Sequence, residues 1–165
     1  MSLKPLLHMT AITLLLTLVS ACTDTEQADM IRQAVAIESG ESCHLCGMII
    51  VNYPGPKGEA YTKTSDKVRK FCSTRGLFSY ILDPEFDHQI KEIYVHDMSK
   101  SPWGKPHDHH FIDARTAWYV VGSNQTGSMG KTLASFGLED DAKAFSTAYG
   151  GQVIPFDAIE LTMLY

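Results

Sequence analysis

The chain has 165 residues, and its 14 lysines and arginines stand against 19 aspartates and glutamates, so the formal charge at pH 7 is −5. An acidic chain without a cluster of basic residues lacks the electrostatic footprint of a nucleic-acid-binding protein, and we expect no nucleic-acid partner. The length fits one compact domain or two small subdomains that share a core.

The N-terminus has the pattern of a lipoprotein signal peptide over residues 1–21. Lys4 precedes an apolar stretch from about Ile12 to Val19, which is too short to cross a bilayer. The stretch ends in VSAC, which resembles a bacterial lipobox and predicts acylation of Cys22. Thr23 rather than an aspartate follows this cysteine, which favours an anchor in the outer membrane facing the periplasm. Residues 22–42 are polar and acidic, and we interpret them as a lipidated flexible tether.

The next part of the chain, residues 43–110, predicts a first β-β-α-β subdomain. Residues 47–52 and 60–64 have the composition of two strands, and a Pro/Gly turn joins them. Ser65 or Asp66 is placed to cap a following helix, which ends before Asp83 and Pro84. Residues 90–98 then predict a third strand. One face of the predicted helix would carry residues spaced by three and four, namely Val68, Phe71, Cys72, Arg75 and Phe78.

Residues 111–165 repeat this order of elements. Strands are predicted at 117–122, 131–136 and 152–156, with a glycine-rich turn after the first and a helix over 139–149 before the last. Each half is too small to bury much core alone, so we predict an α+β fold of two related β-β-α-β subdomains packed together. The repeat is placed at an offset of 74 residues by the pairs Asp66/Asp140, Phe71/Phe145 and Gly76/Gly150.

Soft metal donors are concentrated in the segment CHLCGM, where Cys43, His44, Cys46 and Met48 fall within six residues. In an extended strand, Cys46 and Met48 would share one face. In the strand over 90–98, His96 and Met98 would share the face opposite the core-directed Ile93 and Val95. Thiolate and thioether ligands select monovalent copper, Cu(I), and zinc seldom uses methionine. We therefore predict a Cu(I) site from Cys46, Met48, Met98 and His96, assisted by Cys43.

Other interpretations of these residues stay open. Methionines also fill irregular gaps in a core. Cys43 and Cys46 form a C-x-x-C pair, which in an oxidising compartment is also typical of a disulfide or of a thiol–disulfide oxidoreductase. The β-branched run after the pair predicts a strand, whereas a redox thiol usually lies at a helix N-terminus. Cys72 makes the number of thiols after Cys22 odd, and its place on the predicted helix favours a small buried hydrophobe.

A histidine-rich loop predicts a possible second metal site of unknown identity. It contains His107, His109 and His110, and His-rich tracts bind metal by composition. An exposed polar loop without a metal is the alternative. His44 is also close enough to the cysteines to contribute a ligand.

Several of these segments together resemble the NosL family of periplasmic copper-binding lipoproteins, which serve the maturation of nitrous oxide reductase. They are the lipobox, CHLCGM followed by VNYPGPKG, and the run from YVHDM through FIDARTAWYVVGS to GSMG. Cys46 and Met48 match the family's Cys-Gly-Met motif, whereas His96 and Met98 come from strand periodicity. The resemblance implies two related β-β-α-β subdomains, a fold also similar to the C-terminal part of organomercurial lyase.

The resemblance also implies a lipid-anchored metallochaperone rather than an enzyme. Its expected partners are the apo nitrous oxide reductase and the membrane-bound copper-loading machinery. A lyase that cuts carbon–mercury bonds, with Asp97 as proton donor, ranks last because it leaves both methionines idle. The oligomeric state is not indicated by the sequence.

Overall fold

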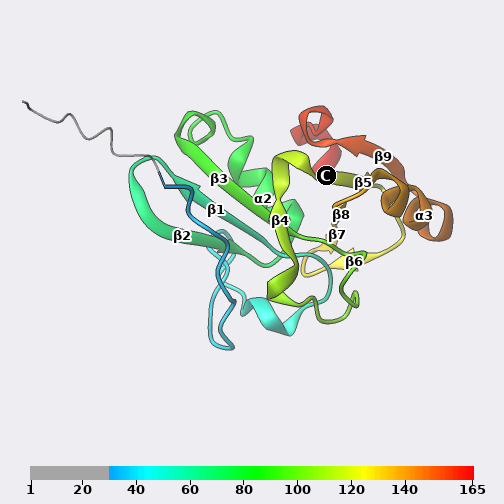
Figure 1. Cartoon of the computed structure of the whole chain (residues 1–165), viewed down its shortest axis with the longest axis horizontal. Helices are drawn as coiled ribbons and strands as arrows, with labels where there is room; N and C mark the ends of the chain where they lie inside the picture. Colours follow the sequence, from blue (N-terminus) through cyan, green and yellow to red (C-terminus); the bar gives the residue numbers. More distant parts are fainter. Residues whose placement is uncertain (1–29) are drawn as a thin grey trace, which may run out of the picture. The chain divides into compact units, whose positions relative to one another are not determined.

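The computed structural model describes residues 30–165, so the predicted signal peptide and the lipidation site at Cys22 lie outside the described residues. Within the described part, the longest helices fall short of the length and apolar character that a bilayer crossing requires. The first half forms a four-stranded antiparallel sheet in the order β2-β1-β3-β4, with α2 in the connection from β2 to β3 (Figure 1). Its elements are β1 (Gly58–Thr62), β2 (Ser65–Phe71), α2 (Thr74–Ile81), β3 (Ile90–His96) and β4 (Phe111–Asp113).

The second half forms a three-stranded antiparallel sheet in the order β8-β5-β9. A two-stranded hairpin, β6-β7, interrupts the connection from β5 to β8, and α3 joins β8 to β9 (Figure 1). The elements are β5 (Trp118–Val121), β6 (Thr126–Gly127), β7 (Gly130–Lys131), β8 (Ala134–Phe136), α3 (Glu139–Tyr149) and β9 (Gln152–Pro155).

The two halves have the same topology, which confirms the predicted pair of β-β-α-β units. In each half the first strand lies between the second strand and the strand that follows the helix. The predicted offset of 74 residues is wrong, because Asp66 and Phe71 lie in β2 whereas Asp140 and Phe145 lie in α3. The repeat is therefore one of topology rather than of those residue pairs.

Two predictions for the first half are wrong: the start of the helix and the strand over residues 47–52. Residues 65–71 form strand β2 rather than a helix, because they pair with β1 along the length of that strand, with Phe71 opposite Gly58. The segment 47–52 is not a strand: Ile49 makes one isolated bridge with Ser42, and Ile50–Asn52 is a short 3-10 helix. The helix α2 begins only after Ser73, whose Oγ accepts a hydrogen bond from the Gly76 N–H at 3.1 Å.

Replacing the cap Ser73 with alanine should lower the free energy of unfolding by about 1 kcal/mol, because the Gly76 N–H loses its acceptor in a buried position. Urea denaturation of both proteins measures this difference. Ser79→Ala, a change within the same helix that removes no cap, is the matched control and should cost less. Equal stability of the wild type and the Ser73 variant would contradict the role of the cap.

One hydrophobic core joins both halves. Phe78 on α2 packs edge-on against Tyr119 of β5, with ring centroids 5.1 Å apart, and lies 5.7 Å from the ring of Phe156 after β9. Ile93 and Val95 point into this core from β3, as their alternation predicts. The halves therefore depend on each other for burial of apolar surface.

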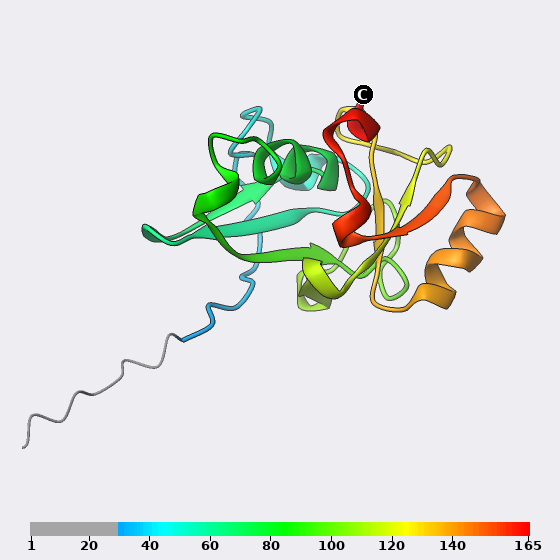
Figure 2. The same cartoon turned by 90° about the horizontal axis from the view of Figure 1, so that it is seen from above.

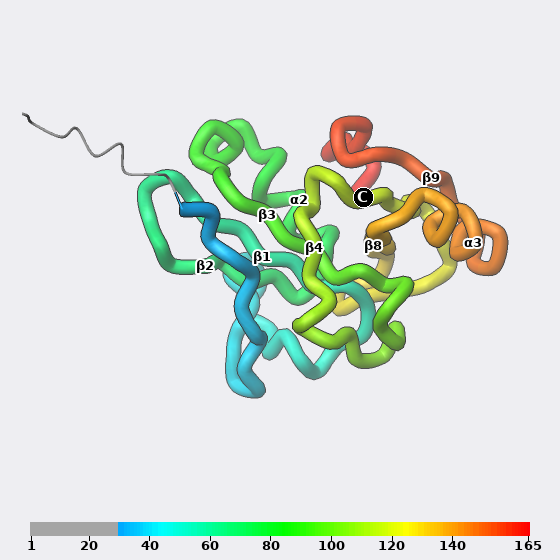
Figure 3. The backbone as a smooth tube through the Cα atoms, viewed as in Figure 1, coloured from blue at the N-terminus to red at the C-terminus, as the bar shows by residue number. Residues whose placement is uncertain are grey.

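The other face of the first sheet is covered by an extended segment, residues 31–37, on the side away from α2 (Figures 1 and 2). Side chains of the sheet bond to the backbone of this segment: Tyr61 Oη donates to the Gln33 carbonyl at 2.9 Å, and Glu59 accepts from the Val35 N–H at 3.0 Å. Arg32 returns two hydrogen bonds to Glu92, at 2.6 and 3.0 Å. The second part of the predicted tether thus lies along the sheet, as the tube in Figure 3 also shows.

Candidate metal centre

A closed loop over residues 43–48 holds the first two thiols. The Cys43 N–H donates to the Met48 carbonyl at 2.8 Å, and the Gly47 N–H donates to the Cys43 carbonyl at 2.9 Å. Gly47 has φ +74°, a left-handed backbone conformation that residues with a side chain rarely adopt. The Ser42–Ile49 bridge closes the base of the loop. This turn, rather than the expected strand, places Cys43 and Cys46 on the same side.

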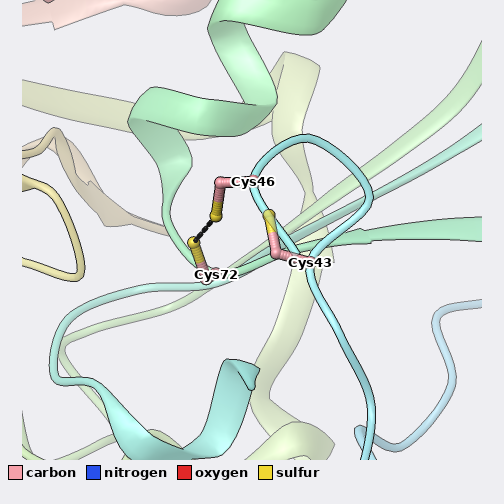
Figure 4. A group of neighbouring side chains, drawn as sticks. All are labelled: Cys43, Cys46 and Cys72. Carbon is pink, nitrogen blue, oxygen red and sulfur yellow. Dashed lines mark hydrogen bonds between the residues drawn. The ribbon is translucent and has the colours of Figure 1, made fainter. Parts of the chain in front are cut away.

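The third thiol is Cys72, which lies between the end of β2 and the cap of α2. The end of β2 is tied to the loop because the His44 N–H donates to the Lys70 carbonyl at 2.8 Å. Cys46 Sγ and Cys72 Sγ are 3.4 Å apart, and the three sulfurs all lie within 4.8 Å of one another. Figure 4 shows them turned toward a common point. Cys43 and Cys72 are buried and Cys46 is exposed, so the group opens to solvent on one side.

The contact between Cys43 and Cys72 favours a thiolate at Cys43 and a protonated thiol at Cys72. The hydrogen bond with Cys72 lowers the pKa of Cys43, against the opposing effect of burial. The same bond and burial raise the pKa of Cys72, which also accepts a hydrogen bond from Ser128 Oγ at 3.0 Å. The N-terminus of α2 directly follows, and its dipole favours negative charge at this point.

This geometry suits a soft metal ion held by three sulfurs. A metal with bonds of about 2.3 Å to three coplanar sulfurs separates them by about 4 Å. The observed spacing therefore needs little rearrangement. All three cysteines are free thiols in the described chain. Within residues 30–165 they are the one group of three or more His, Cys, Asp or Glu side chains whose ligand atoms come this close.

The expectation for Cys72 was right about its burial and wrong about its element. It was expected on the buried face of a helix as a small hydrophobe, but residues 65–71 form a strand, and the strand brings this buried thiol into the sulfur cluster. The odd number of thiols was the signal in the sequence that pointed to an unpaired, reduced set. Ser128, from the turn between β6 and β7, was not anticipated by any pattern.

Two other predicted ligands have different partners in this structure. His96 is buried, with Nδ1 accepting from the Lys57 N–H at 3.0 Å and Nε2 lying 3.3 Å from Asp108 Oδ1. Burial lowers the pKa of His96, although Asp108 opposes this. Met98 packs in a small apolar cluster with Phe136 and Trp103. The role of His96 and Met98 as ligands stays a prediction.

Met48 belongs to the same loop as Cys43 and Cys46 and is partly buried. Its carbonyl closes the loop, as described above, and its thioether stays a predicted ligand. The ring of His44 packs edge-on against Tyr80, with centroids 5.3 Å apart. Burial and the nearby charge of Arg69 lower the pKa of His44.

The three histidines of the second predicted site do gather. The rings of His109 and His110 have centroids 4.2 Å apart, and His107 and His109 stack at 5.5 Å. His110 Nδ1 also lies 3.0 Å from Ser101 Oγ. A metal at this loop stays a prediction.

Three converging free thiols on a fold of two β-β-α-β units are the arrangement expected of a protein that binds a soft metal ion. A family model described as NosL matches residues 34–164. The chain belongs to the NosL family.

Relatives and solved structures agree with this assignment. The chain is 44% identical over 145 residues to the copper-binding lipoprotein NosL of Stutzerimonas stutzeri, covering 88% of this chain and 75% of the relative. It is 36% identical over 154 residues to the copper-binding lipoprotein NosL of Achromobacter cycloclastes, covering 89% and 79%. The crystal structure of the copper chaperone NosL from Shewanella denitrificans matches with a TM-score of 0.80 and 62% identity, over 81% of this chain and 99% of that one.

The solution structure of apo-NosL from Achromobacter cycloclastes matches with a TM-score of 0.51 and 34% identity, over 65% of this chain and 87% of that one. These names describe a copper-binding lipoprotein and a copper chaperone, and none is the name of an enzyme. The predicted likeness to organomercurial lyase stays a prediction.

Proposed function

We propose that this protein binds Cu(I) at Cys43, Cys46 and Cys72 and delivers it for assembly of the copper centres of nitrous oxide reductase. The observation that carries the proposal is the convergence of three free sulfurs within 4.8 Å. Thiolates select Cu(I) over harder ions. The names of the relatives, copper-binding lipoprotein and copper chaperone, support copper as the cargo.

The one-sided exposure of the cluster suits transfer rather than storage. Cys46 is open to solvent, whereas Cys43 and Cys72 are buried. A donor sulfur of a partner therefore approaches at Cys46 and binds copper before the bonds to the inner thiolates break. The ion stays coordinated throughout, and nothing in this exchange requires catalysis of a chemical step. Because the metal takes up thiolates, copper competes with protons and its affinity falls in acid.

The location and partners follow from the same proposal. Acylation of Cys22 would anchor the protein to the periplasmic face of the outer membrane, and the lipoprotein names of the relatives support a lipid anchor. The recipients and donors would be the apo nitrous oxide reductase and the membrane-bound copper-loading machinery. Met48 would complete the ligand set where a fourth donor is needed.

Anaerobic titration of the reduced mature chain tests the proposal. We expect one tightly bound Cu(I) per chain, with sulfur neighbours at about 2.3 Å by X-ray absorption. Mixing the loaded protein with apo nitrous oxide reductase should then move copper to the reductase. If a weak chelator removed all the copper, the proposed Cu(I) binding would be wrong. If copper stayed on the chain in the presence of the apo-reductase, the proposed delivery would be wrong.

The thiol–disulfide oxidoreductase is the weaker alternative. Exchange of a disulfide needs two thiols, usually with one at a helix N-terminus. Cys43 and Cys46 instead lie in a turn, and the thiol next to α2 is the third one, Cys72. Absence of turnover in a disulfide-isomerase assay with the copper-free protein would dismiss this alternative.

A further inference from the structure

Two lysines of the described chain are buried, and only one of them has an acidic partner. Lys70 is 7% exposed, and its Nζ lies 2.6 Å from Glu41 Oε2. Lys57 is 3% exposed, and its Nζ donates to two backbone carbonyls, those of Tyr53 at 2.6 Å and Pro54 at 3.0 Å. Within residues 30–165 no carboxylate forms an ion pair with Lys57. Because a buried charge without a counter-charge is costly, this ammonium calls for an anion other than the described carboxylates.

Lys57 lies opposite Cys72 where two paired strands meet the metal site. In the register of β1 and β2, Gly58 is opposite Phe71, so the next residues outward are Lys57 and Cys72. Residues directly opposite each other in an antiparallel pair place their side chains on the same face. The register therefore brings the buried lysine beside a thiol of the cluster.

The backbone holds Lys57 at this place. Its N–H donates to His96 Nδ1 at 3.0 Å, and its carbonyl accepts from the His96 N–H at 3.3 Å. Beyond the strand ends, the Thr74 N–H donates to the Pro56 carbonyl at 3.2 Å, which keeps the two chains together past Cys72. The lysine is thus fixed on both sides of its own position.

The charge of Lys57 and the charge of the thiol cluster act on each other. Burial lowers the pKa of Lys57 to about 8, and negative charge at Cys72 acts in the opposite direction. In the copper-free cluster Cys72 keeps its proton, because its pKa is raised. Copper takes up thiolates, so one Cu(I) ion among three of them leaves the loaded site with net negative charge. The copper-bound state therefore supplies the counter-charge that the buried ammonium lacks.

We propose that Lys57 is the counter-ion of the copper-loaded thiolates and favours the state in which all three cysteines are deprotonated around Cu(I). This inference rests on the proposed copper function and deepens it, since it names a residue that sets the affinity without contacting the ion. The protons of the thiols leave to the solvent on binding, and the oxidation state of copper does not change.

The test uses Lys57→Met, which removes the charge and keeps an unbranched side chain. Its affinity for Cu(I), measured by competition with a chelator under strict anaerobiosis, should fall about tenfold or more, as it does when an outer-shell partner of a metal site is lost. Lys57→Arg keeps the positive charge and should bind Cu(I) within a few-fold of the wild type. The urea midpoint of copper-free Lys57→Met should be no lower than that of the wild type, because an apolar group in place of an unpaired buried charge is often neutral or stabilising.

Lys105→Met is the matched control, since Lys105 is exposed and its loss changes the net charge by the same amount. It should leave the affinity for Cu(I) unchanged. Wild-type affinity in Lys57→Met, or equal losses of affinity in Lys57→Met and Lys57→Arg, would overturn this inference while leaving the copper function intact. A wild-type chain that takes up no Cu(I) would overturn the proposed function, and this inference with it.

Discussion

Serine in place of Cys72 should weaken Cu(I) binding by about a hundredfold or more, because the site loses one of its thiolates and gains a hard hydroxyl oxygen. The three sulfurs lie within 4.8 Å of one another, so no other cysteine of the described chain is placed to substitute. Competition with a Cu(I) chelator under strict anaerobiosis measures the change. The loss should match that of Cys46→Ser, although the two residues are far apart in the sequence.

The controls separate ligand loss from damage to the fold. Cys72 is fully buried, so the urea midpoint of each copper-free variant is measured beside its affinity, and Cys72→Ala should show the same loss of binding. Ser128→Ala removes only the hydrogen bond to Cys72 Sγ and should cost about tenfold, as outer-shell partners of a ligand do. Copper affinity in both Cys72 variants within a few-fold of the wild type would exclude Cys72 as a ligand.

Replacing Glu59 with glutamine should stabilise the fold more at pH 8 than at pH 5. The difference in free energy of unfolding between the variant and the wild type should shift in favour of the variant by up to about 3 kcal/mol between these two pH values. Glu59 is fully buried in β1, and its Oε1 has no hydrogen-bond partner. Burial raises the pKa of Glu59 from 4.5 to about 7, although the Val35 N–H and Lys70 act in the opposite direction, and Asp108 and Glu41 add to the rise.

The direction of this effect follows from where the proton is held. Because the folded state keeps the Glu59 proton up to about pH 7 and the unfolded state releases it near 4.5, the free energy of unfolding falls as the pH rises through this window. Below 4.5 both states are protonated and the cost is absent. Glutamine has no proton to lose, so its variant should show a flatter pH profile.

Urea denaturation of the copper-free reduced proteins at pH 5 and pH 8 measures this. Burying the glutamine amide costs the same free energy at pH 5 and at pH 8. The change with pH in the stability difference between the variant and the wild type therefore reports only the titration of Glu59. Glu85→Gln, at an exposed position, is the control, and its free energy of unfolding should depend on pH as that of the wild type does. Parallel profiles for the wild type and the Glu59 variant would show that the carboxyl is ionised in the fold or does not titrate in this range.

Local sequence signals were sufficient to predict an element where they mark both of its ends. The helix over Glu139–Tyr149 was predicted with the bounds that the structure has. Acidic residues fill its first turn, and Gly150 and Gly151 adopt positive φ angles of 74° and 95° directly after it. The order of elements in the second half was predictable for the same reason. In the first half the order was predicted correctly, although residues 47–52 are not a strand and residues 65–71 form a strand rather than a helix.

The segment 65–78 shows where local signals failed. Its spacing of apolar residues by three and four fits a helix, but its first seven residues are held in a strand by pairing with β1. That pairing leaves Lys70 buried, with Nζ donating to the carboxylate of Glu41 at 2.6 Å. The strand partner β1 directly precedes the segment, but residues 60–64 were expected to pair with residues 47–52 instead. Glu41 lies 29 residues from Lys70, so no pattern within the segment could reveal that contact.

The same limit applies to the site. Cys43 and Cys46 are neighbours along the chain, and their motif identified them directly. Cys72 joins them only because β2 ends beneath the loop, and the His44–Lys70 backbone hydrogen bond that fixes this contact has no sequence signature. Strand alternation correctly placed His96 opposite Ile93 and Val95, but it could not foresee that Lys57 and Asp108 would occupy both ring nitrogens.

The hydrogen bonds that hold residues 31–37 against the sheet limit how far the folded part could extend from a lipid anchor at Cys22. Among the described residues, Arg32 is the first whose side chain bonds to the sheet, and nine residues, Thr23 to Ile31, stand between it and Cys22 in the sequence. Nine residues reach at most about 30 Å when fully stretched. A tether this short would confine copper exchange to recipients that come close to the lipid surface.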